Sequence, residues 1–160
     1  MPAINARYRH TNLVARDWRR LAKFYADVLG CTPRPPERRY AGEWVGRVTA
    51  IPGASLEGIH LLLPGGGEGG PTLEIFQYDP EAEAPAPALN RPGFAHLAFA
   101  VDDVPAALEA VLAGGGSQHG ALHTMAVPGA GEITLVYAAD PEGNVIELQQ
   151  WTAVEKGAGV

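Results

Sequence analysis

The chain has 160 residues, of which 46% are hydrophobic and 19% are charged. This composition excludes a disordered or collagen-like chain and is typical of a globular protein with one good core, or with two small halves that share one. The net charge of −6 argues against a nucleic-acid or anionic-membrane surface, because both need clustered Lys and Arg. No run approaches the roughly 20 apolar residues of a membrane span, and we expect a cytoplasmic protein.

The first predicted elements belong to an internal repeat. The segment HTNLVARDWRRLAKFYADVLG, which starts at His10, matches HLAFAVDDVPAALEAVLAGGG, which starts at His96, at a constant offset of 86 residues. In each copy an apolar strand that carries the histidine runs into an aspartate, Asp17 or Asp103. An aspartate at this place caps a helix by accepting hydrogen bonds from its free N–H groups. The sequence therefore predicts a strand and then a helix in each copy.

Both predicted helices have one apolar face and a glycine near the end. The apolar residues recur at helical spacing: Trp18, Leu21, Tyr25, Val28 and Leu29 in the first copy, and Val104, Ala107, Leu108, Val111 and Leu112 in the second. Gly30 and Gly114 are placed to end the helices in the left-handed conformation that glycine accepts. Cys31 follows the first helix and is the only cysteine, so we expect an ordinary buried or half-buried thiol.

Three strand-like runs follow each helix, so each copy is predicted to be a βαβββ unit. The predicted strands are about 43–51, 57–63 and 72–78 in the first copy, and about 119–127, 132–139 and 145–151 in the second. The repeats span about 7–78 and 92–151. The segments TPRPPERRYAG at 32–42 and PGGGEGG at 64–70 are predicted to be irregular, residues from about 79 to 91 a linker, and residues 152–160 a loose tail.

The last predicted strand of each copy carries one carboxylate in an apolar run. These residues are Glu74 in TLEIFQY and Glu147 in NVIELQQW. A carboxylate is costly to bury unless it is paired, protonated or bound to a cation. A single strand histidine is more often a hydrogen-bonded core residue, and a single strand glutamate usually faces solvent. Because both copies combine the two, with His10 and His96 on the first strands, we interpret the four residues as one shared metal site.

Strand alternation predicts which side chains share a face with these four residues. The face is aromatic and apolar with polar groups at its centre, which is the usual character of a small-molecule site. Its predicted substrate-binding residues are Tyr8, Asn12, Phe76, Tyr78, Phe94, Gln149 and Trp151. The opposite faces, which include Leu97, Phe99, Ile146 and Leu148, are more uniformly apolar, and we expect them to pack under the helices.

The paired units, together with the motifs FYADVLG, GFAHLAF and DPEGNVIEL, resemble the vicinal oxygen chelate superfamily. The resemblance covers about residues 7–151 as one domain. It implies an α+β fold in which paired βαβββ modules form an eight-stranded curved sheet, or cup, with the helices outside, and it implies a homodimer. It also implies a divalent metal, with His10, Glu74, His96 and Glu147 at the ligand positions.

Two histidines and two glutamates are most similar to the ligands of glyoxalase I. This branch implies a lyase or isomerase that uses nickel, cobalt, zinc or manganese and acts by proton transfer on a small chelating carbonyl substrate. Glu74 or Glu147 is the expected base. The sequence favours this reading over two others: a metal-free drug-sequestering resistance protein, and an Fe(II) extradiol-type dioxygenase. His60, His119 and His123 have no matching ligand role, and we expect them to be structural or exposed.

Overall fold

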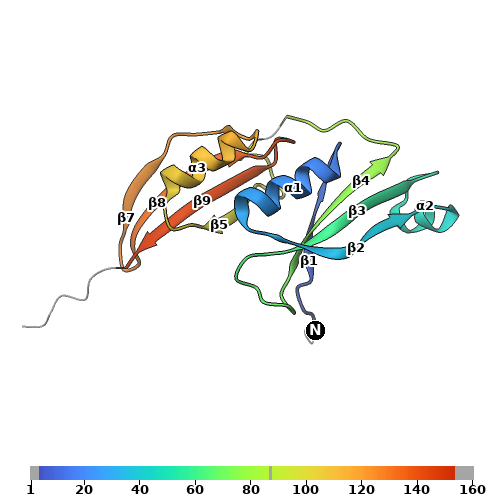
Figure 1. Ribbon diagram of the computed structural model, residues 1–160, viewed down its shortest axis with the longest axis horizontal. Coiled ribbons are helices and arrows are strands. Elements are labelled where there is room, and N and C mark those ends of the chain that lie inside the picture. The colour runs from blue at the N-terminus through green and yellow to red at the C-terminus, as the bar shows by residue number, and fades with distance from the viewer. Residues whose placement is uncertain (1–3, 87, 154–160) are drawn as a thin grey trace, which may run out of the picture. The chain divides into compact units, whose positions relative to one another are not determined.

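Figure 1 shows a computed structural model of the chain, which describes residues 4–86 and 88–153. The chain divides into two compact units, Met1–Ala84 and Pro85–Val160. The described residues form nine strands and three helices, and the strands make two mixed sheets. The α+β class that the sequence predicts is confirmed. The strand count exceeds the predicted eight because a two-residue strand, β6, forms in the second unit.

The first unit is a four-stranded sheet with one helix on its face. Its elements are β1 (His10–Val14), α1 (Trp18–Leu29), β2 (Thr32–Tyr40), α2 (Glu43–Thr49), β3 (Ser55–Leu62) and β4 (Thr72–Asp79). The strand order is β1-β4-β3-β2, and β1 runs parallel to β4 while the other pairs are antiparallel. Helix α1 packs on β3 and β4 with Trp18, Leu21 and Tyr25 buried. On the opposite sheet face, α2 covers the part around Phe76, and the remaining residues of that face can build a site.

The ends of α1 follow the predicted capping signals. The carboxylate of Asp17 accepts a hydrogen bond of 3.0 Å from the backbone N–H of Arg20, and Gly30 ends the helix with φ +69°. Cys31 follows and is 3% exposed. Burial raises the pKa of this thiol to about 11, so it is an inert buried group as expected.

The second unit repeats the strand order of the first. Its elements are β5 (Leu97–Ala100), α3 (Val104–Ala113), β6 (Ser117–Gln118), β7 (His123–Val127), β8 (Gly131–Ala139) and β9 (Val145–Thr152). The order is β5-β9-β8-β6, with β7 also paired to β8, and β5 runs parallel to β9. Helix α3 packs on β8 and β9, where Ile146 and Leu148 are fully buried and Phe99 on β5 is 8% exposed.

The cap of α3 differs by one residue from the prediction. Asp103 caps the start of the helix through a 2.9 Å hydrogen bond from the N–H of Ala106. Gly114 keeps a right-handed conformation with φ −75°, and the left-handed residue is Gly115, with φ +91°. The chain offers three consecutive glycines here, so the sequence alone does not determine which one makes the turn.

Two predictions between the first helix and β3 are wrong. Residues 32–42 were expected to be irregular, but Thr32–Tyr40 form β2. Proline is tolerated there because β2 is an edge strand, and Pro35 and Pro36 lie where its register to β3 shifts between Arg34 and Arg38.

The run 43–51 was expected to be a strand, but residues 43–49 form helix α2. Glu43 pairs with Arg47 one turn later, and the hydroxyl of Thr49 donates to the carbonyl of Val45. Val45 is 1% exposed and packs with Ala54, Leu56 and Phe76. Local pairing and burial of one face therefore outweigh the strand preference of its β-branched residues.

The structure describes most of the predicted linker but only the first residues of the predicted tail. Residues 80–86 and 88–96 contain no helix or strand, which leaves His96 immediately before β5 rather than on it. Thr152 is the last residue of β9, and the rest of the predicted tail from 154 lies outside the described residues. The predicted extent of one domain made of two repeats stays a prediction.

Gly58 supplies a test of how closely β3 and β4 approach. A Cβ atom at this residue would lie 1.9 Å from the carbonyl oxygen of Ile75 and 2.3 Å from the ring of Phe76. We expect Gly58→Ala to lower the free energy of unfolding by about 3 kcal/mol or more, as severe overpacking does. Gly69→Ala, where a Cβ meets nothing within 4 Å, should change it by about 0.5 kcal/mol or less. Chemical denaturation measures both, and equal stability of the two variants would contradict the predicted strand contact.

Candidate metal centre

Three potential metal ligands meet on the open sheet face of the first unit. His10 comes from β1, His60 from β3 and Glu74 from β4 (Figure 1). The ligand atoms of the three side chains all lie within 4.8 Å of one another. The carboxylate oxygens of Glu74 are 2.9 Å from Nε2 of His60 and 3.6 Å from Nε2 of His10. Among the described residues this is the one such cluster of three or more His, Cys, Asp or Glu.

The cross-strand register explains why the cluster forms. His60 and Glu74 are direct partners in the antiparallel pair β3–β4, and Asn12 is the partner of Glu74 in the parallel pair β1–β4. Direct partners point to the same face of a sheet. His10 lies two residues before Asn12 and therefore faces the same side. The two strands that flank β4 thus place three polar side chains around its carboxylate, two from β1 and one from β3.

Both oxygens of Glu74 are held by neighbours. The amide Nδ2 of Asn12 donates to Oε2 over 2.9 Å, and His60 approaches Oε1. The other ring nitrogen of His60, Nδ1, lies 2.9 Å from the hydroxyl of Thr72. The side chain of Glu74 is 14% exposed and that of His60 is 20% exposed. The carboxylate is therefore partly desolvated and fixed in place, as a metal ligand is in many proteins.

His60 is the site residue that sequence analysis missed. The comparison of the two sequence repeats did not single out His60, because no histidine occupies the matching place in the second copy. A hairpin count would have found it. Residue 67 is the centre of the glycine-rich segment 64–70, and His60 and Glu74 are each seven residues from it. A symmetric antiparallel hairpin places such residues opposite each other.

The second unit carries the matching histidine–glutamate pair. Nε2 of His96 lies 3.1 Å from Oε2 of Glu147, whose side chain is 13% exposed. Tyr137 takes the place that His60 has in the first unit, because it is the direct cross-strand partner of Glu147. Its ring lies 5.2 Å from that of His96, edge to face. Burial and a hydrogen bond to Glu147 raise the pKa of Tyr137, so its phenol stays protonated.

A side chain in the closing turn fixes this register. Asp140 is 3% exposed, and one of its oxygens accepts hydrogen bonds from the N–H groups of Glu142 and Asn144. The other oxygen accepts from the side-chain amide of Asn144 over 2.8 Å. The turn between β8 and β9 is therefore rigid. It sets Tyr137 against Glu147 and so determines what surrounds the second carboxylate.

The predicted substrate-binding residues divide into three kinds of place. Asn12 contacts Glu74 directly. Phe76 is 6% exposed and packs with Val45 of α2, and Tyr78 packs against the same cluster, so these two side chains belong to the core beneath α2. The burial of Phe76 depends on α2, a helix that the sequence did not predict, and a role of Phe76 in binding stays a prediction.

The other predicted substrate-binding residues lie at or near the surface, and two of them contact each other on β9. Tyr8 is 67% exposed, and its hydroxyl contacts that of Thr11. Phe94 is fully exposed in the segment before β5. Trp151 is 48% exposed and donates through Nε1 to the side-chain oxygen of Gln149. Their role in binding stays a prediction. His119 and His123 are exposed, which is one of the two placements expected for them.

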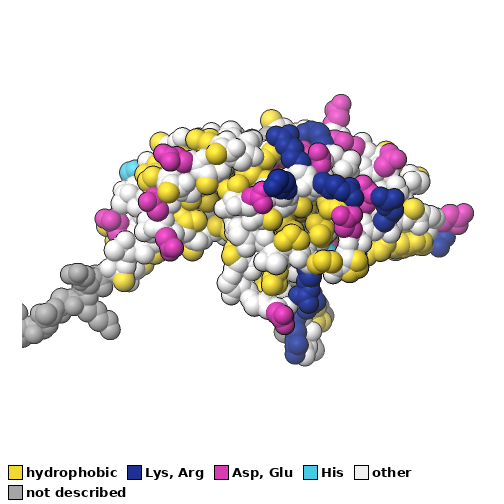
Figure 2. All heavy atoms as spheres, in the orientation of Figure 1, with side chains coloured by type: hydrophobic (Ala, Val, Ile, Leu, Met, Phe, Trp, Pro, Cys, Tyr) yellow, Lys and Arg dark blue, Asp and Glu magenta, His cyan; other side chains and the backbone are white. Residues whose placement is uncertain are grey.

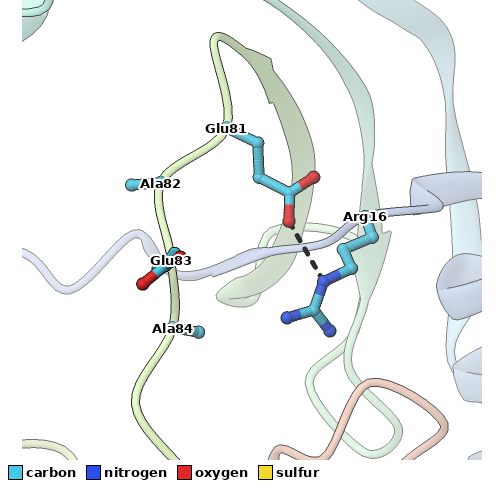
Figure 3. A pocket seen from close by; sticks show the side chains of 5 residues that line it. All are labelled: Arg16, Glu81, Ala82, Glu83 and Ala84. Atoms are coloured by element: carbon cyan, nitrogen blue, oxygen red, sulfur yellow. Dashed lines mark hydrogen bonds and ion pairs between the residues drawn. The ribbon is translucent and has the colours of Figure 1, made fainter.

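A shallow pocket of about 250 Å³ lies away from these ligands. It is lined by Arg16 and by the chain from Glu81 to Ala84. Figure 3 shows the guanidinium of Arg16 directed at the carboxylate of Glu81, 3.0 Å away. Both side chains are about half exposed, and among the described residues no cluster of three or more His, Cys, Asp or Glu forms in this pocket. We therefore place the candidate site at Glu74 and not in this pocket.

The two units differ in charge. The first 84 residues contain ten basic and ten acidic residues, whereas the rest contain two basic and eight acidic, so the net charge of −6 falls on the second unit. Figure 2 shows Lys and Arg side chains gathered over the first unit. Several of them pair with carboxylates: Arg19 with Glu37, and Arg39 with Glu57. This surface is a network of exposed ion pairs, which contribute little stability individually.

A family model decides the relationship of this chain to known proteins. The model of the Glyoxalase/Bleomycin resistance protein/Dioxygenase superfamily matches residues 7–148. The chain belongs to this superfamily. The glyoxalase superfamily, which corresponds to the vicinal oxygen chelate resemblance, thus accounts for nearly the whole sequence. None of the curated proteins matches the sequence.

Solved structures agree with the fold of the glyoxalase superfamily. A glyoxalase family protein from Bacillus cereus matches with a TM-score of 0.77 at 20% identity, over 94% of this chain and 97% of that one. A glyoxalase/bleomycin resistance protein/dioxygenase family enzyme from Burkholderia phytofirmans matches with a TM-score of 0.57 at 16% identity, over 89% and 97% of the two chains.

A genomically encoded fosfomycin resistance protein from Listeria monocytogenes, complexed with Mn(II) and sulfate, gives a TM-score of 0.52 at 13% identity, over 94% and 95%. These likenesses show the fold. In the part of the chain that the structure describes, no helix is long and apolar enough to span a membrane.

Burial of His60 leads to a testable titration. In metal-free protein, we expect its pKa to lie below the ordinary value of 6.5, because burial disfavours the charged ring more than Glu74 favours it. As the pH falls, His60 is protonated in the unfolded chain before it is protonated in the folded protein. The contribution of His60 to the free energy of unfolding therefore falls as the pH drops below 6.5.

NMR titration of the imidazole signals measures this shift. Glu74→Gln should lower the pKa of His60 further, because the carboxylate opposes the effect of burial. Glu132→Gln, which removes an exposed carboxylate of β8, is the control. A His60 ring that titrates above 6.5 in the metal-free protein would contradict the environment described for it.

Proposed function

We propose that this chain is a metal-dependent lyase or isomerase of the glyoxalase I-like kind, which moves a proton on a small chelating carbonyl substrate. The ligands of the divalent ion in this proposal are His10, Glu74, His96 and Glu147. One observation carries it: each unit sets a partly buried carboxylate of its last strand against an imidazole, which lies on the first strand in one unit and immediately before it in the other. A carboxylate that is 13–14% exposed is costly to bury without a partner, and a divalent cation is one partner that an imidazole–carboxylate pair can hold.

The donor chemistry fits nickel, cobalt, zinc or manganese. Imidazole and carboxylate together suit these ions, and the described residues place no thiolate in the cluster. When bound, such an ion polarises a chelated carbonyl and makes the neighbouring C–H more acidic. The fosfomycin resistance protein of the same fold was solved with Mn(II), which supports manganese among the candidates.

The chain's own residues supply the proton transfer. Glu74 or Glu147 takes the proton from the carbon next to the carbonyl and returns it to the product, which is general acid–base catalysis. Asn12 donates to Glu74 and holds the carboxylate in one orientation. The protonated phenol of Tyr137 plays the same positioning part for Glu147. The expected cytoplasmic location, small-molecule substrate and homodimer stay predictions.

An Fe(II) extradiol-type dioxygenase is the second candidate. The observation that favours it is the donor set of the first unit, because two histidines and one carboxylate form the triad that non-haem Fe(II) oxygenases use. This candidate requires oxygen consumption with catechols. A metal-free drug-sequestering protein, the third possibility raised by the sequence, has no need of the two imidazole–carboxylate pairs.

Proton exchange in heavy water tests the proposed reaction. The metal-loaded protein should introduce deuterium next to the carbonyl of a methylglyoxal–thiol adduct or of a 2-methyl acyl thioester. Replacing the base, by Glu74→Gln or Glu147→Gln, should reduce the exchange rate by about 10²–10⁴-fold. Glu132→Gln, on the exposed side of β8, should leave the rate unchanged.

Three outcomes would contradict the proposal. Exchange that both glutamate variants retain would remove the carboxylates from the mechanism. Oxygen uptake with catechols after Fe(II) loading, without proton exchange, would favour the dioxygenase. Failure to bind a stoichiometric ion after loading with nickel, cobalt, zinc and manganese, together with tight binding of an unreacted drug, would favour sequestration.

A further inference from the structure

We infer that His60 is a metal ligand, so that His10, His60 and Glu74 form a complete divalent-metal site within the first unit alone. The inference deepens the proposed function, because both require an ion at Glu74. It departs from that proposal in its ligands: His60 has no counterpart in the four residues matched by the repeat, and the first unit holds the ion without His96 or Glu147.

The spacing of the three side chains fits one coordination sphere. Ligand atoms about 2.0–2.2 Å from an ion lie roughly 3.0–3.5 Å apart when they are neighbours around it. The Glu74 oxygens lie 2.9 Å from His60 and 3.6 Å from His10, which straddles that range. The rings of His10 and His60 are nearly perpendicular, with centroids 5.6 Å apart, so their nitrogens converge without stacking. The ion needs only small movements of these side chains.

Outer contacts already orient two of the three ligands. Thr72 lies 2.9 Å from Nδ1 of His60 and fixes the ring so that Nε2 faces Glu74. Asn12 holds Oε2 of Glu74. The ring of Phe76 packs edge to face with that of His60, with centroids 6.2 Å apart, and supports it from the core. Partners of this kind raise affinity in metal sites because they fix the ring and its tautomer.

The second unit shows by contrast what His60 adds. At the equivalent place Glu147 faces Tyr137, whose phenol offers no imidazole nitrogen to an ion. Among its described residues this unit therefore offers His96 and Glu147 but no third donor of the same cluster. Two units with the same strand order thus differ in metal-binding capacity because of one cross-strand residue.

The donor set indicates the class of ion. Two imidazoles and one carboxylate favour first-row transition ions such as zinc or cobalt over magnesium or calcium, which prefer oxygen ligands. Three protein ligands leave coordination positions open for water or for substrate oxygens. His10 is the most exposed of the three, with 44% of its side chain accessible, so the open positions lie on the solvent side.

Calorimetric titration of Zn(II) into the full-length, tag-free, chelator-treated protein tests the inference, with metal analysis as the check on stoichiometry. We expect one tightly bound ion in the wild type. His60→Gln should weaken affinity by about 100-fold or more, since it removes a ligand, and Thr72→Val by about 10–100-fold, since it removes an outer partner. His123→Gln, which replaces an exposed histidine of β7, should bind as the wild type does.

A double variant, His96→Gln with Glu147→Gln, tests whether the first unit suffices. It should still bind one ion with affinity within about tenfold of the wild type. A Co(II)-loaded sample adds a readout that folding defects do not mimic, because each coordinated imidazole gives a paramagnetically shifted N–H signal. His60→Gln should remove one such signal, while the double variant keeps the signals of His10 and His60.

The outcomes separate this inference from the proposed function. Wild-type affinity and an unchanged Co(II) spectrum in His60→Gln, with binding abolished in Glu74→Gln, would overturn the role of His60 and leave the metal proposal standing. Loss of the ion in the double variant would overturn the self-contained site in the same way. A wild-type protein that binds no ion would overturn both.

Discussion

A partly desolvated carboxylate in an apolar strand is the constraint on which each unit depends. Glu74 and Glu147 sit next to the fully buried residues of β4 and β9, where an unpaired charge would be costly. Each carboxylate contacts an imidazole from the neighbouring first strand or the segment before it, and each lies opposite a cross-strand partner. The parallel pairing of first and last strand makes this possible, because it brings residues more than fifty positions apart in sequence to one sheet face. The polar centre of each unit is therefore a consequence of its topology.

The two units use the same topology for different chemistry. His60 and Tyr137 occupy the same register position opposite their glutamates, yet one offers a neutral nitrogen and the other a protonated hydroxyl. The net charge is also confined to the second unit. Repeats of this kind keep the strand order that builds the fold while single cross-strand positions diverge. This divergence is where the function of an individual superfamily member is decided, since fold alone does not determine function.

The sequence predicted α1 and α3, their N-caps and most of the strands because their signals are local: Asp17 and Asp103, apolar periodicity, and glycine-rich turns. It did not predict β2 or α2, because both depend on tertiary contacts. The prolines of β2 are tolerated since it is an edge strand, and α2 is stabilised by the burial of Val45. At the site, the repeat pointed to both histidine–glutamate pairs. It could not point to His60, whose importance arises from hairpin register and has no equivalent in the second copy. Whether Tyr8, Phe94 and Trp151 contact a substrate depends on a ligand, and exposure alone does not decide it.

The central claim is that the face around Glu74 binds a divalent ion. The most direct measurement is a crystal structure of the zinc-loaded protein with data collected on both sides of the zinc absorption edge. The account predicts that the strongest anomalous peak lies about 2.0–2.2 Å from a carboxylate oxygen of Glu74 and from the imidazole nitrogens of His10 and His60. A stoichiometric zinc peak elsewhere in the chain, with Glu74 contacted only by Asn12, His10 and His60, would contradict it.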